Sequence, residues 1–330
     1  MMFVHLTTHS AYSLQEGLLT PSELVQAATA NGMPAIGLTD HRLLTGTIEF
    51  VTACRDVGLQ PIIGLEIDLA SGPLHLLATN LAGWSNVCRL SSALTLMDQP
   101  DGPCSLHTLA EYSDGLIALS NQPQPLIDIF NGRLYVSLNN PARAASFSKM
   151  ANQLGLPTVV THPVYYLDPK QSSLQRTLTA IRLNQTVGRL SQEFIAPPDS
   201  HFIGQQEMEE RFKDYPEALV ATLEIAERCK FELPIGVPNM PVVRLPAGLT
   251  PAEHLRNKAI EGAKHLYGEI TSSIQSRLDH ELEVISNMGY EPIFLIVEDI
   301  LNFARETGVP FSSRGSAASS LVAHCLGITS

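Results

Sequence analysis

Residues 33–69 read MPAIGLTDHRLLTGTIEFVTACRDVGLQPIIGLEIDL, and this stretch decides the fold. Two short apolar runs, at residues 35–38 and 61–67, are the length of buried strands, and a longer segment with helical spacing separates them. A strand, a helix and a second strand in this order predict a parallel pair joined by a helical crossover. The stretch therefore places the chain in the α/β class.

The same alternation continues on both sides of this unit. Strands are predicted at residues 3–6, 35–38, 61–67, 74–78, 116–119, 133–138 and 158–161. Thr20, Pro21 and Glu23 form a helix-initiating capping box, and Gly32 stands where a helix-terminating glycine belongs. Seven strands separated by helices predict a mostly parallel sheet, either closed as a barrel or open and doubly wound.

The pattern changes after about residue 169 to nearly continuous helix. Helices are predicted at residues 217–229, 272–288 and 292–307, and a second T-P-x-E start at Thr250 predicts another helix. The proline-rich stretch 234–246 is typical of a linker. A second, mainly helical part is therefore expected to follow it.

Composition excludes several classes of protein. The chain has 330 residues, of which 44% are hydrophobic and 16% charged, and its net charge of -12 does not favour a free-standing duplex-DNA binder. The five cysteines are scattered and form no C-x-x-C pair, which argues against a disulfide framework. With no signal-peptide pattern and no long apolar run, we expect a cytoplasmic protein without membrane contact.

Imidazole and carboxylate groups follow the first three predicted strands. They are His9 and Glu16 after the first strand, Asp40 and His41 after the second, and Glu66 at the end of the third. Loops at the carboxyl ends of parallel strands build the site in such folds, and this mixture of ligands suits Zn²⁺, Mn²⁺ or Fe. Structural roles remain open: the aspartate as a helix cap, the histidines as hydrogen-bonded turn residues, and the glutamate as an ion-pair partner.

A second candidate site lies near residue 315. Arg314, Gly315 and Ser316 precede a helical pattern, so free backbone N–H groups, a helix dipole and a guanidinium could together bind a phosphate. The alternative is that Ser316 is an ordinary N-cap.

Longer stretches resemble the bacterial DNA polymerase III alpha subunit, a C-family DNA polymerase. FVHLTTHSAYSLQEGLLTPSELV (3–25), GMPAIGLTDHRLLTGTIEF (32–50) and GLQPIIGLEIDL (58–69) resemble the first three motifs of its PHP (polymerase and histidinol phosphatase) domain. RLDHELEVISNMGYEPIFLIVEDILNFARETGVP (277–310) and SSRGSAASSLVAHCLGIT (312–329) resemble the opening of its palm. The resemblance implies a PHP-type, seven-stranded distorted (β/α) barrel at 1–235, then a linker and partial palm at 236–330. It also implies that residues 314–316 contact the triphosphate of an incoming nucleotide.

The family's metal ligands are only partly matched. The resemblance places ligands at His9, Glu16, His41 and Glu66, whereas other ligand positions fall on Thr7, Pro73, Gln122, Pro163 and Tyr165. His75 and His162 are close to lost positions but out of register. We therefore expect a degenerate, structural PHP site whose candidate cofactor is a residual divalent ion, Zn²⁺, Mn²⁺ or Mg²⁺.

The resemblance implies a role in DNA replication beside the remainder of the alpha subunit or other replisome proteins. Mg²⁺ and DNA would be bound by the complete polymerase, whose D-x-D catalytic acids have no match here, so no catalytic residue is assigned and the chain alone is expected to be inactive. Two alternatives stay open, namely a metal-dependent phosphoesterase or 3′–5′ exonuclease, and a non-catalytic replication interaction module.

Overall fold

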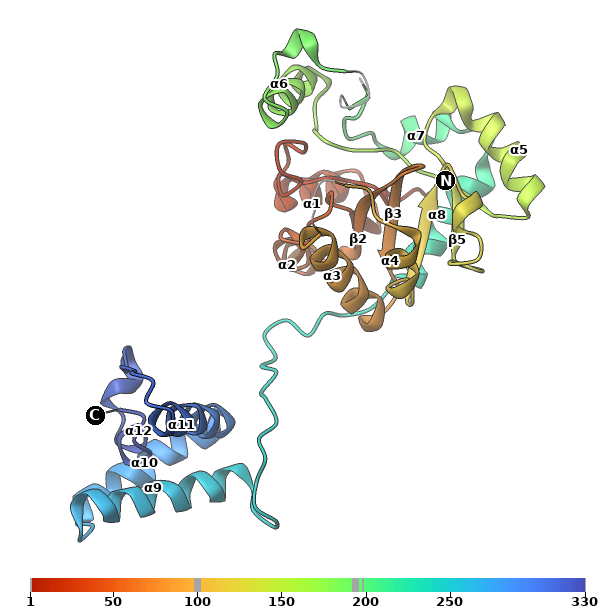
Figure 1. Ribbon diagram of the computed structural model, residues 1–330. Helices are drawn as coiled ribbons and strands as arrows, with labels where there is room; N and C mark the ends of the chain where they lie inside the picture. Colours follow the sequence, from red (N-terminus) through yellow and green to blue (C-terminus); the bar gives the residue numbers. More distant parts are fainter. Residues whose placement is uncertain (1, 98–101, 192–195, 198, 330) are drawn as a thin grey trace. The chain divides into compact units, whose positions relative to one another are not determined.

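The computed structural model describes residues 2–97, 102–191, 196–197 and 199–329. The chain divides into two compact units, Met1–Ile235 and Gly236–Ser330, and each is described by itself (Figure 1). Among the described residues, no helix is both long enough and apolar enough to cross a bilayer.

The first unit is built on a curled sheet of six strands. In sheet order they are β1 (Ala35–Leu38), β2 (Gln60–Leu69), β3 (Gly72–Ala78), β4 (Leu116–Ser120), β5 (Leu134–Leu138) and β6 (Thr158–Val160). β1 and β2 are parallel, β3 is antiparallel to both of its neighbours, and β4, β5 and β6 are parallel. The α/β class and the mostly parallel sheet agree with the sequence prediction. The strand predicted at residues 3–6 is the exception, because no regular strand forms there.

An extended amino-terminal segment takes the place of the seventh strand. The amide of Gly37 in β1 donates to the carbonyl of His5 at 2.7 Å, and the backbone amide of His9 donates to the carbonyl of Val164 at 2.8 Å. The segment thus bridges β1 and the chain that follows β6, where Thr8 and Val164 form an isolated parallel bridge. Gly37 has to be a glycine, since a Cβ atom there would overlap the carbonyl of Leu6.

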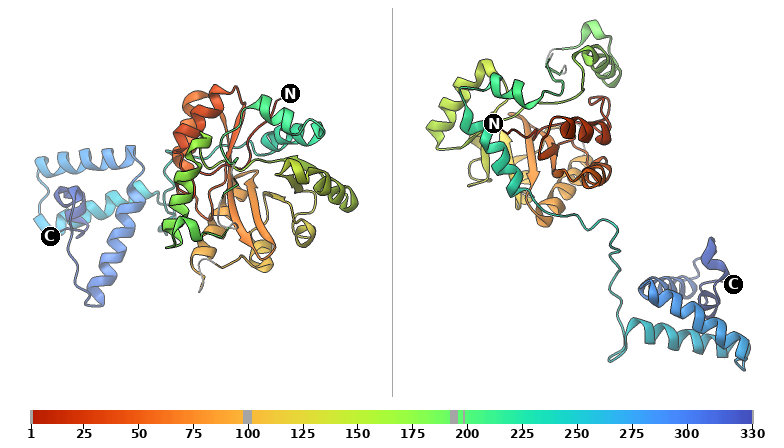
Figure 2. Two further views of the ribbon diagram at one scale, coloured as in Figure 1. Left: turned by 90° about the horizontal axis from the view of Figure 1, so that it is seen from above. Right: turned by 180° about the vertical axis from the view of Figure 1, so that it is seen from behind.

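The helices of the first unit lie around the curled sheet, most of them outside it and α8 against its inner face (Figure 2). They are α1 (Pro21–Ala30), α2 (Thr47–Val57), α3 (Leu81–Thr95), α4 (Leu106–Glu111), α5 (Ala144–Leu154), α6 (Ser172–Arg182), α7 (Gln205–Arg211) and α8 (Pro216–Arg228). The capping box predicted for α1 is confirmed, with Thr20 and Glu23 bonding reciprocally. Leu24, Phe50 and Phe147 belong to one outer core, and the apolar faces of α3 and α4 form another.

The inner face of the sheet is apolar at one end and polar at the other. Because alternate residues of a strand face the same side, β2 presents Ile62 and then Glu66 inward, and β3 presents Leu77 and then His75. The apolar members form a buried core with α8, which includes Val4, Leu6, Ala35, Ile62, Leu77, Ile117, Leu119, Tyr135, Val159, Ala221, Ile225, Ala226 and Cys229. The polar end therefore remains available as a pocket.

The second unit is a small helical assembly. It contains α9 (Pro251–Tyr267), α10 (Ser272–Asn287), α11 (Glu291–Glu306), the 3-10 helix η6 (Ser316–Ser319) and α12 (Leu321–Cys325). The described residues 230–249 form neither helix nor strand, and the predicted capping box between Thr250 and Glu253 is present. α9 and α12 pack so closely that a Cβ atom at Gly262 would overlap the carbonyl of Cys325.

Candidate metal-binding pocket

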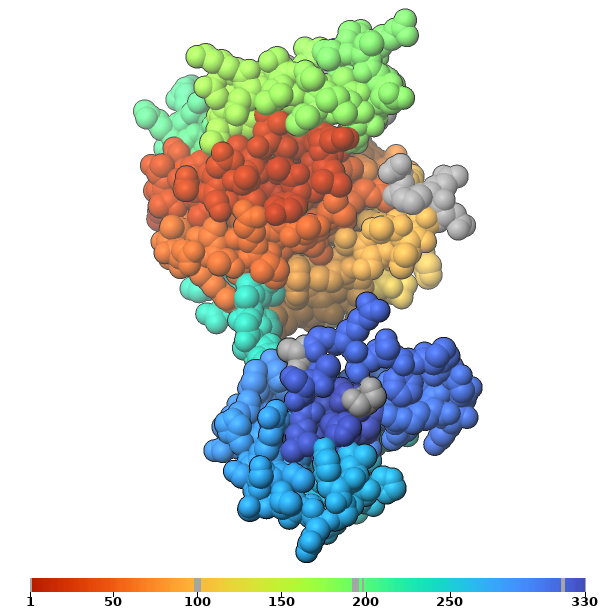
Figure 3. Space-filling model, turned by 90° about the vertical axis from the view of Figure 1, so that its left-hand side faces the viewer, coloured from red at the N-terminus to blue at the C-terminus, as the bar shows by residue number. Residues whose placement is uncertain are grey.

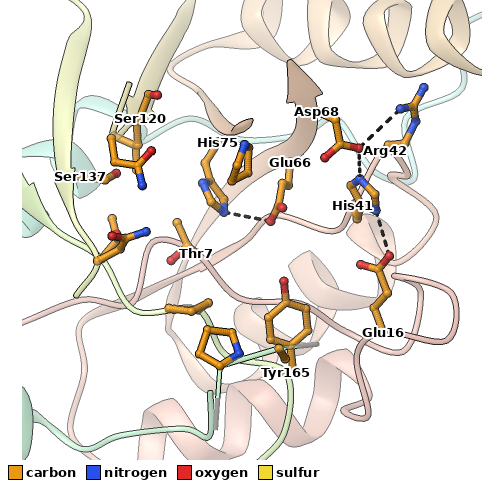
Figure 4. Close-up of a pocket in the computed structure, with 18 of the residues that line it drawn as sticks. Thr7, Glu16, His41, Arg42, Glu66, Asp68, His75, Ser120, Ser137 and Tyr165 are labelled. Carbon is orange, nitrogen blue, oxygen red and sulfur yellow. Dashed lines mark hydrogen bonds and ion pairs between the residues drawn. The ribbon is translucent and has the colours of Figure 1, made fainter. Parts of the chain in front are cut away.

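A pocket of about 710 Å³ opens at the polar end of the curled sheet (Figure 4). It is lined by Thr7, Glu16, His41, Arg42, Glu66, Asp68, Pro73, His75, Leu119, Ser120, Asn121, Ser137, Asn139, Thr161, Pro163, Tyr165, Gln175, Arg182, Leu183, Ala196 and Pro197. In Figure 4, Ser120 and Ser137 lie on one side of Glu66, and His41, Arg42 and Glu16 lie on the other. The pocket thus has an uncharged side and a charged side.

Three side chains near the centre could hold a metal ion. His9 Nε2 lies 2.5 Å from Glu66 Oε2, and His75 Nε2 lies 2.9 Å from the same oxygen. One ligand atom from each residue can be chosen so that all lie within 4.8 Å of one another. Apart from its ion pair with Glu66, the buried Nε2 of His75 has no hydrogen-bond partner among the described residues. Two imidazoles and one carboxylate are a ligand set that proteins use for zinc and related ions.

The β2–β3 hairpin explains why His75 belongs to this group. Glu66 pairs directly with His75 across the antiparallel ladder, and Asp68 pairs with Pro73. His75 therefore lies in the pocket two residues beyond the position at which the resemblance placed a ligand. His162, the other nearby histidine, points elsewhere, because its Nε2 lies 2.9 Å from the carbonyl oxygen of His201.

Charge interactions stabilise the contacts of Glu66 with His9 and His75. Burial raises the pKa of the Glu66 carboxyl, but His75 and His9 outweigh burial and hold that pKa well below its usual range. Burial lowers the pKa of His9, and the Glu66 carboxylate more than compensates, so the net pKa of His9 is raised. Without a bound ion the group is thus held as a buried ion pair.

His41 forms a second cluster on the charged side of the pocket. Its Nδ1 lies 3.1 Å from Glu16 Oε1, and its Nε2 lies 2.7 Å from Asp68 Oδ2. Burial lowers the pKa of His41, but the hydrogen bonds to Asp68 and Glu16 raise it to about 10. Two arginines join the cluster: Arg182 Nη1 lies 3.0 Å from Glu16 Oε1, and Arg42 Nη1 lies 3.6 Å from Asp68 Oδ2.

Asp40, also predicted as a ligand, is tied to the first loop. Its Oδ1 accepts hydrogen bonds from the Ser10 amide at 2.6 Å and the Ser13 hydroxyl at 2.7 Å, and its Oδ2 accepts from the Ser10 hydroxyl at 2.7 Å. Both oxygens are therefore already engaged, and the buried carboxylate organises the loop that carries His9 into the pocket.

Other pocket positions carry side chains that coordinate poorly. Thr7, Pro73, Pro163 and Tyr165 line the pocket, and proline offers no ligand atom. The Tyr165 ring stacks on His9 with centroids 4.2 Å apart, and burial raises the pKa of its phenol well above the usual value. Tyr165 is thus a protonated packing partner of His9.

The predicted phosphate-binding turn lies in the second unit. Arg314 and Gly315 are exposed, and Gly315 has φ of 101°, a conformation that glycine adopts readily. The turn leads into η6, and the N-cap of the short helix α12 is Ser320, so the helical pattern expected after the turn is interrupted. The side chain of Ser316 lies outside the described residues.

Comparisons with known proteins agree with these two units. Residues 5–154 match the PHP domain, and residues 253–330 match the bacterial DNA polymerase III alpha NTPase domain. An error-prone DNA polymerase from Symbiobacterium thermophilum is 36% identical over 376 residues, covering 100% of this chain and 34% of that protein. The DNA polymerase III subunit alpha of Bacillus subtilis is 31% identical over 362 residues, covering 100% of this chain and 32% of that protein.

The chain carries a PHP domain and a bacterial DNA polymerase III alpha NTPase domain, and these polymerase relatives match it over its whole length. It spans about one third of the length of the curated relatives it matches. The residues that match the PHP domain contain β1 to β5 and one part of the pocket lining, and β6 and the remaining lining residues follow them. A solved amidohydrolase from Chromobacterium violaceum has a TM-score of 0.37 at 14% identity, covering 49% of this chain and 87% of that one, a likeness too distant to bear on function.

The structure brings part of the predicted set together. Glu16, His41 and Glu66 line the pocket, and the buried His9 contacts Glu66, whereas Asp40 is engaged with the first loop. Asp68 and Arg182 were missed, and His75 was considered only as a neighbour out of register. A hairpin signal was present for His75, because Ala70 and Ser71 separate two apolar runs.

Proposed function

We propose that this chain is the PHP-containing part of a polymerase III alpha-like DNA polymerase and that its pocket is structural, holding at most one divalent ion. The ligand set is the observation that carries this proposal. One group of three ligands, His9, Glu66 and His75, suffices for a single ion. Hydrolysis by a two-ion or three-ion centre requires ligands for each ion, and Thr7, Pro163 and Tyr165 supply poor ligands or none.

The chemistry of the three ligands also limits which ion is bound. Imidazole nitrogen suits Zn²⁺, the carboxylate also suits Mn²⁺, and Mg²⁺ prefers an octahedral shell of oxygen atoms. We therefore assign Zn²⁺ or Mn²⁺ to the central group. Mg²⁺ and DNA are assigned to the complete polymerase, where the rest of the alpha subunit or other replisome proteins would be the partners, in the cytoplasm.

Elemental analysis combined with a nuclease assay tests the structural role. After dialysis we expect no more than one ion per chain, and release of a 3′-terminal nucleotide from labelled single-stranded DNA no faster than that of Glu66→Gln. Two or more ions per chain, together with cleavage that Glu66→Gln abolishes, would contradict the proposal. Primer extension by residues 1–330 alone would do so too, since no catalytic residue is assigned to them.

A single-ion phosphoesterase is the second candidate. Its support is the central group itself, because two histidines and one glutamate in an open pocket leave coordination positions for water and substrate. Hydrolysis of bis(p-nitrophenyl) phosphate with Zn²⁺ or Mn²⁺ separates the candidates. The structural role is expected to give equal rates for the natural chain and for His75→Ala.

A further inference from the structure

We infer that Arg182 is a built-in counter-cation of the pocket, which neutralises Glu16 and keeps a second metal ion away from the charged side. Arg182 is the last residue of α6 and lies beyond residues 5–154, which match the PHP domain. This inference gives a physical cause for the one-ion limit in the proposed function, and its test does not depend on whether the central group binds an ion.

The geometry of Glu16 supports this role. Its Oε1 atom lies 3.0 Å from Arg182 Nη1 and 3.1 Å from His41 Nδ1, so both contacts converge on one carboxylate oxygen. The side chain of Glu16 is only 14% exposed and that of Arg182 is 31% exposed, which limits screening of the pair by water. A metal ion at Glu16 would have to displace or approach the guanidinium.

Asp68 completes the cluster in the same way. Its Oδ2 atom lies 2.7 Å from His41 Nε2 and 3.6 Å from Arg42 Nη1. Figure 4 shows His41 between Glu16 and Asp68, with Arg42 beside Asp68. Both acids that could serve a second ion are therefore paired with cationic side chains. Arg42 and Arg182 are the arginines among the lining residues, and both lie on this side rather than at the central group.

Because arginine keeps its charge, it would oppose the binding of a second metal ion at every physiological pH. A guanidinium stays charged at every physiological pH, whereas an imidazole can lose its proton and become a ligand. Protonation changes at His41 alone would thus leave Arg182 as a fixed positive charge at Glu16. A fixed charge this close opposes the binding of a divalent ion by Coulomb repulsion, and it also satisfies the carboxylate that the ion would need.

Arg182 reaches the pocket from α6, in the chain that follows β6. α6 follows the segment in which Leu18 donates to the carbonyl of Tyr165 at 2.8 Å and Tyr165 donates to that of Ser200 at 2.9 Å. Gln175, also on α6, lines the pocket. Figure 3 shows the green surface around α6 beside the red surface of the amino-terminal residues. Arg182 and Gln175 thus enter the pocket lining from the same helix.

Mn²⁺ titration of the full chain by calorimetry tests the inference. Natural protein is expected to show at most one tight site. Arg182→Gln is expected to bind one further Mn²⁺ with an affinity raised on the order of tenfold or more, as removal of one adjacent charge implies. Arg182→Lys keeps the charge and should behave as the natural chain. Arg176→Gln, on an exposed position of the same helix that does not line the pocket, is the matched control.

Three further results decide between gain of a site and loss of structure. Circular dichroism and thermal unfolding in chelator should show Arg182→Gln folded, and adding Glu16→Gln to it should remove the new site. Equal Mn²⁺ binding by Arg182→Gln and the natural chain would overturn the inference, as would an equal gain in Arg176→Gln. If the natural chain binds no ion but Arg182→Gln gains one, the proposed one-ion centre fails and the role of Arg182 stands.

Discussion

Replacement of Glu66 by glutamine is expected to destabilise the first unit, because it removes one partner of a buried ion pair. Glu66 contacts His9 at 2.5 Å and His75 at 2.9 Å, and the side chains of His9 and Glu66 are 0% and 12% exposed. Breaking such a pair leaves the other charge buried without compensation, at a cost of about 3–5 kcal/mol. His9 can shed its proton instead, so we expect about 2–3 kcal/mol at neutral pH.

The pKa shifts of Glu66 and His9 also predict how the stability difference changes with pH. In the natural chain the folded pKa of Glu66 is lowered and that of His9 is raised, so the pair contributes fully between the unfolded values of 4.5 and 6.5. The contribution of Glu66 is lost as pH falls through its folded pKa, and that of His9 is lost as pH rises through its own. In Glu66→Gln, burial instead opposes protonation of His9. The deficit of the variant should therefore grow as pH falls from 8 to 5.

Trp84 provides the assay. It is the single tryptophan of the chain and packs against the outer cores of the first unit, so its fluorescence reports the unfolding of that unit alone. Urea unfolding in chelator avoids stabilisation by bound metal. The expected loss corresponds to a Tm lower by about 4–12 °C. Glu224→Gln, exposed on α8, should stay within about 0.5 kcal/mol of the natural chain. A Glu66→Gln deficit equally small, or one independent of pH, would refute the reasoning.

Three other substitutions have expected outcomes. Ile225→Ala empties a fully buried position between α8 and the inner face of the sheet, and Trp84 fluorescence should show a loss of about 2–5 kcal/mol. His41→Asn should reduce stability most near pH 6 and least near pH 10, because the contribution of His41 is complete below 6.5 and is lost as pH rises through its folded pKa of about 10; a difference that widens at high pH would contradict this. Gly262→Ala should destabilise the second unit by about 1–3 kcal/mol through its clash with Cys325, measured by calorimetry, while Trp84 fluorescence stays unchanged.

Local patterns in the sequence were sufficient for most elements of the fold. The apolar runs at 35–38, 61–67, 74–78, 116–119, 133–138 and 158–161 all lie on strands or at their ends. Residues 3–6 look the same in sequence but form no regular strand. That segment bonds to β1 through His5 and to the chain after β6 through Thr7 and His9, and such long-range pairing leaves no local signal.

The residues of the site likewise fall into those with a local sequence signal and those placed by long-range contacts. His9, His41 and Glu66 could be predicted together because each follows or ends a strand of one sheet. His75 depends on hairpin register: the two-residue turn after Leu69 fixes the pairing of Glu66 with His75, and a shift of one residue would turn that imidazole to the other face. Arg182 depends on how the chain after β6 crosses the pocket. No spacing rule relates a residue on α6 to Glu16, which is 166 positions earlier.

The layered inner face explains how side chains of the pocket can be replaced while the fold persists. The apolar layer around Ile225 and the outer cores bury large hydrophobic side chains, and such burial is the main favourable term in folding. The polar layer instead contains charges whose pairing roughly offsets the cost of burying them. Ligands in that layer can thus be replaced at small cost, provided that each remaining acid keeps a cation. Arg182 at Glu16, His41 at Asp68 and His9 at Glu66 meet that condition.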